Sequence, residues 1–190
     1  MAKSDVDQHI SPKFPTFLTQ EDVDALNAGR HGAPFDVLGS HKSGNKRWIA
    51  TFQPNVSSVS AIVAGKETPL ARLAGDVFAA PVAGKTYTLE RQFGDGTVDA
   101  VHDPFSFQPV LSDFDQYLMG EGTHKELWRA LGAHVIRHQK VEGVHFAVWA
   151  PNARRVSVVG AFNNWDGRCH PMRAAGQTGV WEVFVPDLGV

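Results

Sequence analysis

The residues best suited to chemistry form a short run, Phe162-Asn163-Asn164-Trp165, followed by Asp166-Gly167. Paired Asn residues and an Asp-Gly step are typical of a surface turn, so an indole and two amides should point outward. The apolar face of a pyranose ring stacks on an indole, and amides pair with its hydroxyls. Trp165, Asn163 and Asn164 are therefore predicted to bind carbohydrate. The alternative is that Trp165 plugs the end of a β-sandwich or packs against another domain.

Two further tryptophans are predicted to pack between domains. Along residues 143–149 apolar side chains alternate, and Val144, Phe146 and Val148 are expected to face a core. Trp149 then lies on the opposite face, where an interdomain contact is predicted and a sugar platform is the alternative. Trp128 lies on a predicted helix between two domains and is assigned to packing as well.

Metal sites, cofactors and catalytic residues are not predicted. His134 and His138 are four residues apart, but in a strand such positions are separated by about 13 Å. The single Cys169 can form neither an intrachain disulfide nor a Cys-based zinc cage. Asp103-Pro104 follows a strand and is interpreted as a turn device rather than as a catalytic carboxylate.

The composition is that of an ordinary globular protein, with 43% hydrophobic and 20% charged residues in 190. A net charge of -2 and scattered Lys and Arg give no reason to expect nucleic acid or an anionic membrane as a partner. The start lacks the apolar core of a signal peptide, and no run reaches the roughly 18 apolar residues of a membrane span. We expect a cytoplasmic protein.

The elements that must position these residues are mostly strands. After a lead-in at residues 1–18, predicted to be flexible, Thr19 and Asp22 predict a helix by a capping box, and Gly29 predicts its end. Period-2 alternation and turn residues then predict strands at 46–52, 56–63, 76–80, 86–93 and 97–101. Evenly spaced strands favour a β-sandwich over a parallel sheet, so residues 19–110 are predicted to form one sandwich domain.

A second domain is predicted at residues 134–190, after a linker at 111–133. Within the linker a helix is expected at 124–131, with Thr123 and Glu126 as a capping box and Gly132 as its end, wedged between the domains. The segments 48–63 and 145–160 resemble each other at a constant spacing, which indicates two copies of one module. The second copy is expected to be truncated, with strands missing and part of its core exposed. The fold class is thus all-β, with tandem immunoglobulin-like β-sandwiches.

Long segments of the chain resemble bacterial glycogen (1,4-α-glucan) branching enzymes. HGAPFDVLGSH at residues 31–41 is similar to the opening of their first N-terminal domain, and residues 103–135 are similar to their domain junction. Residues 143–173 resemble the start of a carbohydrate-binding module of the CBM48 type. Ala161 departs from the family pattern, which has an acidic residue at this position.

The resemblance implies a region that binds and positions α-1,4-glucan or glycogen ahead of a separate catalytic (β/α)8 domain, in glycogen biosynthesis. Retaining cleavage needs two carboxyl groups about 5 to 5.5 Å apart, and no motif in the chain places such a pair. We therefore expect the chain alone to be inactive, although the enzymes it resembles are glycosyltransferases.

Other interpretations stay open. The chain could be a free-standing glucan-binding regulatory or scaffold protein. It could also be the N-terminal part of another α-amylase-superfamily enzyme, such as a debranching or trehalose-forming hydrolase. Alternatively, its sandwiches could only shield and dimerise an enzyme.

Overall fold

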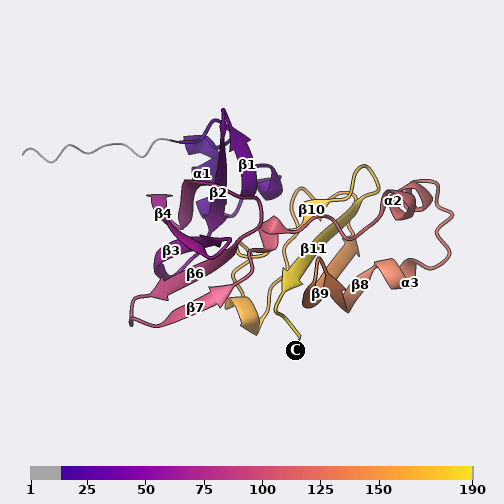
Figure 1. Ribbon diagram of the computed structural model, residues 1–190. Coiled ribbons are helices and arrows are strands. Elements are labelled where there is room, and N and C mark those ends of the chain that lie inside the picture. The colour runs from indigo at the N-terminus through magenta and orange to yellow at the C-terminus, as the bar shows by residue number, and fades with distance from the viewer. Residues whose placement is uncertain (1–13, 190) are drawn as a thin grey trace, which may run out of the picture.

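The computed structural model describes residues 14–189 and has two β-rich domains side by side (Figure 1). The first contains a seven-stranded sheet and the second a four-stranded sheet, and every strand pair in both is antiparallel. The prediction of tandem, all-β domains of the sandwich type is confirmed.

The first domain begins with α1 (Gln20–Asn27), and its start agrees with the prediction. The Thr19 hydroxyl accepts a hydrogen bond from the Asp22 N–H at 3.2 Å, and the Asp22 carboxylate accepts one from the Thr19 N–H at 2.8 Å. Val23 and Leu26 are buried beneath the helix. Gly29 follows with a φ of +66°, the left-handed conformation that glycine adopts without strain.

The residues just before α1 are packed. Leu18 is buried in the core under the helix, Phe14 and Phe17 lie against that core, and the Thr16 N–H donates to Ser43 Oγ. The predicted flexible lead-in is therefore wrong for residues 14–18, because their apolar side chains cover the helix and sheet. Residues 1–13 of that prediction lie outside the described part of the chain.

The seven strands of the first domain pair in the order β1-β2-β5-β4-β3-β6-β7. The five predicted strands are present, whereas β1 and β4 were not predicted, because neither sequence, GSHKS or KETPLARLA, shows a clear period-2 alternation of apolar residues. The strands are β1 (Gly39–Ser43), β2 (Lys46–Phe52), β3 (Val56–Val63), β4 (Lys66–Ala74), β5 (Val77–Val82), β6 (Thr88–Phe93) and β7 (Val98–Val101).

Strand β4 connects two layers of this domain. Its first half pairs with β3 and its second half with β5, with an irregularity between Arg72 and Ala74. The core between the layers is made of aliphatic and aromatic side chains: Ile49, Val56, Val59, Ala61, Val63, Leu70, Phe78, Ala80, Tyr87 and Leu89. A second core lies between the β2–β5 layer and α1.

A buried carboxylate ends this domain. Asp103 caps the short helix η2 (Pro104–Ser106) by accepting from the Phe105 N–H at 3.1 Å, which confirms the predicted turn device. The hydroxyl of buried Tyr87 donates to the same carboxylate at 2.7 Å. Burial raises the pKa of Asp103 to about 6, although the hydrogen bonds from Tyr87, the Phe105 N–H and Thr51 oppose this.

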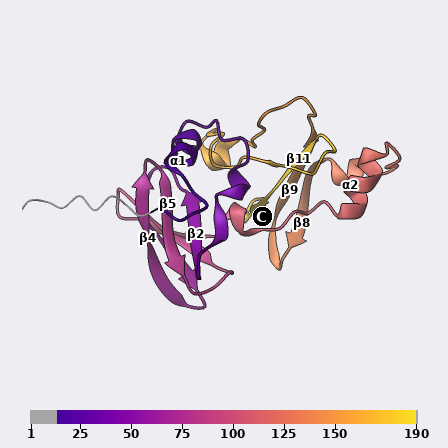
Figure 2. The ribbon, with the colours of Figure 1, turned by 90° about the horizontal axis from the view of Figure 1, so that it is seen from above.

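The segment predicted as a linker is organised differently from the prediction. Its main helix is α2 (Asp113–Gly120), capped by Ser112 and Asp115, and only a four-residue helix, α3 (Leu127–Ala130), follows. The predicted helix over 124–131 and its Thr123–Glu126 box are wrong, because the Glu126 N–H donates to His124 Nδ1 and residues 123–126 are not helical. Figures 1 and 2 show α2 beside the second sheet, on the side away from the first domain, so α2 does not wedge between the domains.

The predicted linker also repeats the start of the first domain. In both places a capping-box Asp contacts the Nε2 of a later His at 3.2 Å: Asp22 with His31, and Asp115 with His124. A second His then reaches a Leu carbonyl, His41 with Leu38 at 2.8 Å and His134 with Leu131 at 2.9 Å. Each segment also has glycines at positive φ in matching places, Gly29 and Gly39 in one, Gly122 and Gly132 in the other. The internal repeat therefore covers the helical segments as well as the strands.

The second sheet has the order β10-β11-β9-β8, made of β8 (Gly132–His138), β9 (Val141–Trp149), β10 (Arg173–Ala174) and β11 (Val180–Pro186). One face packs against residues 150–172, which are largely irregular and make one isolated bridge between Ser157 and Pro171. The other face is covered by the segment with α2 and α3, through Leu111 and Ala130.

Because both faces of the second sheet are covered, its buried residues differ from the predicted core. Val144 is buried as expected, but His145 and Ala147 are buried too, and Val148 is exposed. The simple one-sided alternation is thus wrong for β9. Truncation was expected to expose some of Val156, Val158, Phe184 and Val185. Phe184 and Val185 are buried, and Val156 and Val158 are partly buried.

A carboxylate holds the covering segment in place. Glu182 Oε2 accepts hydrogen bonds from the N–H groups of Val110 at 3.0 Å and Leu111 at 3.1 Å, and it lies 3.0 Å from His145 Nε2. Burial alone would raise the pKa of Glu182, but these hydrogen bonds bring the pKa below its ordinary value.

No helix between residues 14 and 189 is long and apolar enough to cross a membrane.

Tyr87→Phe tests the buried pair. The substitution removes one donor from the Asp103 carboxylate, so we expect a loss of about 1–3 kcal/mol in the free energy of unfolding at pH 8. Because the pKa of Asp103 is about 6, the carboxyl is mostly protonated at pH 5, and the loss should be smaller there. Urea unfolding at both pH values measures it, with the exposed Tyr117→Phe as control. An equal loss at both pH values would contradict ionisation of Asp103 in this range.

Candidate functional site

The predicted binding residues lie on a tight turn after the short helix η3 (Ala161–Asn163). Asn164 has a φ of +53° and Trp165 a φ of +59°, so two consecutive residues other than glycine are left-handed. Asn tolerates this conformation, but Trp rarely adopts it, and the surroundings must impose it. The Trp165 N–H donates to the Gly160 carbonyl at 2.9 Å, and the residue is 71% exposed. The turn therefore holds a large apolar ring in solvent.

Asn163 fixes this turn from inside. Only 7% of the residue is exposed, its Oδ1 accepts from the Gly160 N–H at 2.9 Å, and its Nδ2 donates to the Val158 carbonyl at 2.9 Å. The same Nδ2 lies 3.0 Å from His170 Nδ1. Its amide is thus engaged within the protein, unlike the outward contact predicted from sequence, whereas Asn164 is exposed.

His170 and Phe162 form the base of the turn. Burial lowers the pKa of His170 to about 4, with a smaller contribution from the Arg91 charge, so the ring is neutral near pH 7. The Phe162 ring lies 5.3 Å from the His170 ring and remains 42% exposed. The turn therefore presents two aromatic side chains, Phe162 and Trp165, beside an exposed amide.

A bidentate ion pair follows the turn. Asp166 accepts from Arg168 Nη2 at 2.7 Å and from Arg168 Nε at 3.0 and 3.1 Å. The hydrogen bond from Arg168 holds the pKa of Asp166 below its ordinary value, and the same bond raises the pKa of Arg168. Asp166 is thus ionised over the physiological pH range and orients the guanidinium.

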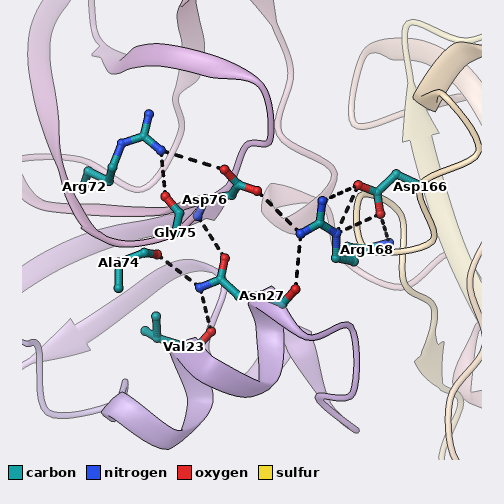
Figure 3. Close-up of polar contacts among 8 residues, drawn as sticks. All are labelled: Val23, Asn27, Arg72, Ala74, Gly75, Asp76, Asp166 and Arg168. Carbon is teal, nitrogen blue, oxygen red and sulfur yellow. Dashed lines mark hydrogen bonds and ion pairs between the residues drawn. The ribbon is translucent and has the colours of Figure 1, made fainter.

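The guanidinium reaches the first domain (Figure 3). Arg168 Nη1 donates to the Asn27 carbonyl at 3.2 Å, at the end of α1, and lies 3.6 Å from Asp76 Oδ2. The Asn27 side chain in turn accepts from the Asp76 N–H at 2.9 Å and donates to the Ala74 carbonyl. A Cβ on Gly75 would lie 2.2 Å from Asn27 Oδ1, and Gly75 has a φ of +56°, so another residue there would displace the Asn27 amide and strain the backbone.

A second polar contact joins the domains. The Asp187 carboxylate accepts from the His102 N–H at 3.3 Å and lies 3.0 Å from His102 Nδ1. Phe35 of the first domain also packs on the core of the second domain. The Arg173 guanidinium makes a cation–π contact with it, 3.8 Å from the centre of the Phe35 ring.

A cleft of about 350 Å³ lies between the domains, next to the turn. Cys169 lines it, and burial raises the pKa of this thiol to about 11, which leaves it protonated and unreactive. The first domain contributes Phe52, Gln53, Pro54, Asn55, Arg91, Phe93 and His102, and the second contributes Phe162, Asn164, Asp166, His170 and Asp187.

The two tryptophans predicted to pack between domains are on the surface. Trp128 is 66% exposed and contacts the guanidinium of Arg129, and Trp149 is 63% exposed. Neither is buried between the two sheets described here. Within residues 14–189, no three His, Cys, Asp or Glu side chains are grouped so that they could hold a metal ion.

Sequence reasoning missed the interdomain contacts. Arg168 and Asn27 are 141 positions apart, and no local pattern connects them. The repeat could have indicated the organisation of residues 111–134, because Leu18, Asp22, Gly29, His31 and Leu38-Gly39 all recur there in register.

Two family models match the chain. Residues 19–105 match the N-terminal domain of alpha-1,4-glucan branching enzyme GlgB, and residues 130–190 match carbohydrate-binding module 48, also described as the isoamylase N-terminal domain.

Curated relatives agree with these matches. The chain is 45% identical over 182 residues to the 1,4-alpha-glucan branching enzyme GlgB of Paramagnetospirillum magneticum, and 50% identical over 172 residues to GlgB 1 of Xanthomonas campestris pv. campestris. These alignments cover 95% and 87% of the chain but only 25% and 23% of the relatives, so the chain spans about a quarter of their length. A solved pullulanase from Anoxybacillus sp. LM18-11 has 14% identity over 78% of the chain and 22% of the pullulanase, with a TM-score of 0.24, which is too low to support a conclusion.

Arg168→Ala tests the contact between the domains. It removes a charged donor from the Asn27 carbonyl and an ion pair that is partly exposed, so we expect a loss of about 1–2 kcal/mol in unfolding free energy. Amide hydrogen exchange should become faster at residues 27–29 and 164–168 together. Arg154→Ala, an exposed Arg nearby, is the control. If both variants behave alike, Arg168 does not hold the domains together.

Proposed function

Residues 19–105 belong to the family of GlgB N-terminal domains and residues 130–190 to carbohydrate-binding module 48, and from this we propose that the chain binds α-1,4-glucan for a branching enzyme. Its role is to hold and position a glucan chain or glycogen, and the chemistry belongs to a catalytic domain outside this chain. The branch-forming activity of the curated relatives belongs to proteins about four times as long as the part matched here.

The observation that carries the proposal is the exposed Trp165. Burying an apolar ring is favourable, so a strained turn that holds an indole 71% exposed needs a reason beyond stability. Stacking against a pyranose face supplies one. Asn164, also exposed and adjacent, offers an amide to the sugar hydroxyls, and Asn163 acts as a positioning residue beneath them.

Weak contacts of this kind are useful to a polymer-acting enzyme. One glucan chain can touch several points of the surface, and each contact raises the local concentration of the chain near the others. A binding region ahead of a catalytic domain can therefore select and steer long chains without high affinity for any single sugar. We place this work in the cytoplasm, where glycogen is made.

We further propose that Trp128 and Trp149 pack against the missing catalytic region. The repeat supports this, because Phe35 and Trp128 occupy the same place in the two copies, as do Phe52 and Trp149. In the first copy both aromatic rings contact the following domain, through Arg173 over Phe35 and Arg168 over Phe52. In the second copy the equivalent rings are exposed and available for the next domain.

The match of residues 19–105 to the GlgB N-terminal domain supports a branching enzyme over another α-amylase-superfamily enzyme. A free-standing binding protein would use the same Trp165 surface, and only the sequence of the longer gene product separates the two. Glycogen binding by the Trp165→Ala variant distinguishes a binding role of the chain from a purely structural one.

Trp165→Ala is expected to weaken binding of glycogen and maltoheptaose by about 10-fold, because it removes the stacking ring. Trp165→Phe, which keeps an aromatic face, should lose less. Affinity electrophoresis in glycogen-containing gels measures the change for the 190-residue chain. Trp128→Ala is the matched control, as an equally exposed Trp far from the turn, and should bind like the wild type. Unchanged binding by Trp165→Ala would argue for a structural role instead.

Trp128→Ala and Trp149→Ala test the packing proposal. In the longer protein each should lower the unfolding free energy by about 1–3 kcal/mol, because the rings are buried there, and in the 190-residue chain by less than about 0.5 kcal/mol. Tyr117→Ala is the control. Tyr117 corresponds in the repeat to Asp24, which is exposed in the first copy, so Tyr117 is expected to stay exposed in the longer protein. Equal effects in the short and long proteins would refute the packing role.

A further inference from the structure

The cleft between the domains borders the turn that exposes Trp165. Phe162, Asn163 and Asn164 line it before Trp165 in the chain and Asp166 lines it after, so the proposed sugar platform lies between lining residues of the turn. Its volume, about 350 Å³, is within the range of about 300–1000 Å³ seen for small-molecule sites.

We infer that this cleft is a second α-glucan subsite, shared by both domains, into which a chain stacked on Trp165 extends. The inference rests on the proposed function, since it assumes that the chain binds α-glucan. It assigns a sugar-binding role to the first domain through Asn55, an exposed turn residue.

The charges in the cleft are already paired, which favours a neutral ligand. Arg91 donates to Asp99 at 2.6 and 2.9 Å and to Gln53 Oε1 at 3.2 Å. On the other wall Asp166 is paired with Arg168. A phosphate or carboxylate ligand would compete with these carboxylates for the guanidinium groups, whereas a polyhydroxyl ligand needs only amides and rings.

The remaining lining groups suit a sugar. Phe162 is packed against His170 yet 42% exposed, so part of its ring is free to meet a pyranose face. Asn55 from the first domain and Asn164 from the second are both exposed and both left-handed, with φ of +62° and +53°. An Asn from each domain thus lines the same cleft.

The cleft is built before any ligand arrives. The contacts of Arg168 with Asn27 and Asp76 and the contact of His102 with Asp187 join its two walls by separate elements. Walls that are held in place lose little freedom on binding, so weak hydrogen bonds can add to affinity.

A chain long enough to reach both places should bind better than one that reaches only Trp165. We expect the 190-residue chain to bind maltoheptaose at least about fivefold more tightly than maltotriose, equivalent to about one well-formed hydrogen bond or stacking contact. Asn55→Gly should remove most of this gain and leave maltotriose binding unchanged. Glycine adopts the positive φ of Asn55 without strain, so folding should be preserved.

The control is Asn45→Gly, an exposed turn amide at the opposite end of β2, which should keep the full gain. Titration calorimetry or fluorescence with the two sugars provides the affinities. A full gain in Asn55→Gly, or an equal loss in Asn45→Gly, overturns the shared subsite. If the wild type binds neither sugar, the proposed function itself is overturned. If Trp165→Ala binds maltotriose as well as the wild type does, the Trp165 platform is overturned. The Asn55→Gly comparison still tests the cleft in that case.

Discussion

The arrangement of the candidate site depends on one charged side chain, Arg168. Its guanidinium is oriented by Asp166 on its own loop and reaches the Asn27 carbonyl and Asp76 in the other domain. Because Asp166 follows Trp165 directly, the strained turn and the interdomain contact are parts of one loop. This contact joins the loop that carries Trp165 to the first domain, so the first domain contributes to the site although Trp165 lies in the second.

Each domain consists of more than its strands. In both copies a capped helix precedes the sheet. A following His contacts the capping-box Asp, and a second His contacts a Leu carbonyl. In the second copy, Glu182 ties the start of this segment to the sheet through the amides of Val110 and Leu111. A segment that looks like a linker in sequence therefore forms one face of the second core.

The repeat also relates interfaces. The first domain meets the second through Phe35 and Phe52, which lie beneath the Arg173 and Arg168 guanidinium groups. The same positions in the second copy hold Trp128 and Trp149, both exposed. The proposed packing of Trp128 and Trp149 would thus repeat the mode of contact that Phe35 and Phe52 make within this chain.

The sequence by itself determined the local elements. Thr19, Asp22 and Gly29 gave the bounds of α1, period-2 alternation located five strands of the first domain, and Asn163 to Gly167 predicted the exposed turn, because each depends on neighbours within a few residues. Only the tertiary structure decided which faces are buried and which side chains meet. His145 and Ala147, which the alternation places opposite the predicted core, are buried in a second core, and the Asn163 amide is bonded inside the turn. Arg168 contacts Asn27, which lies 141 positions away. Such outcomes depend on packing between distant segments, which no local pattern encodes.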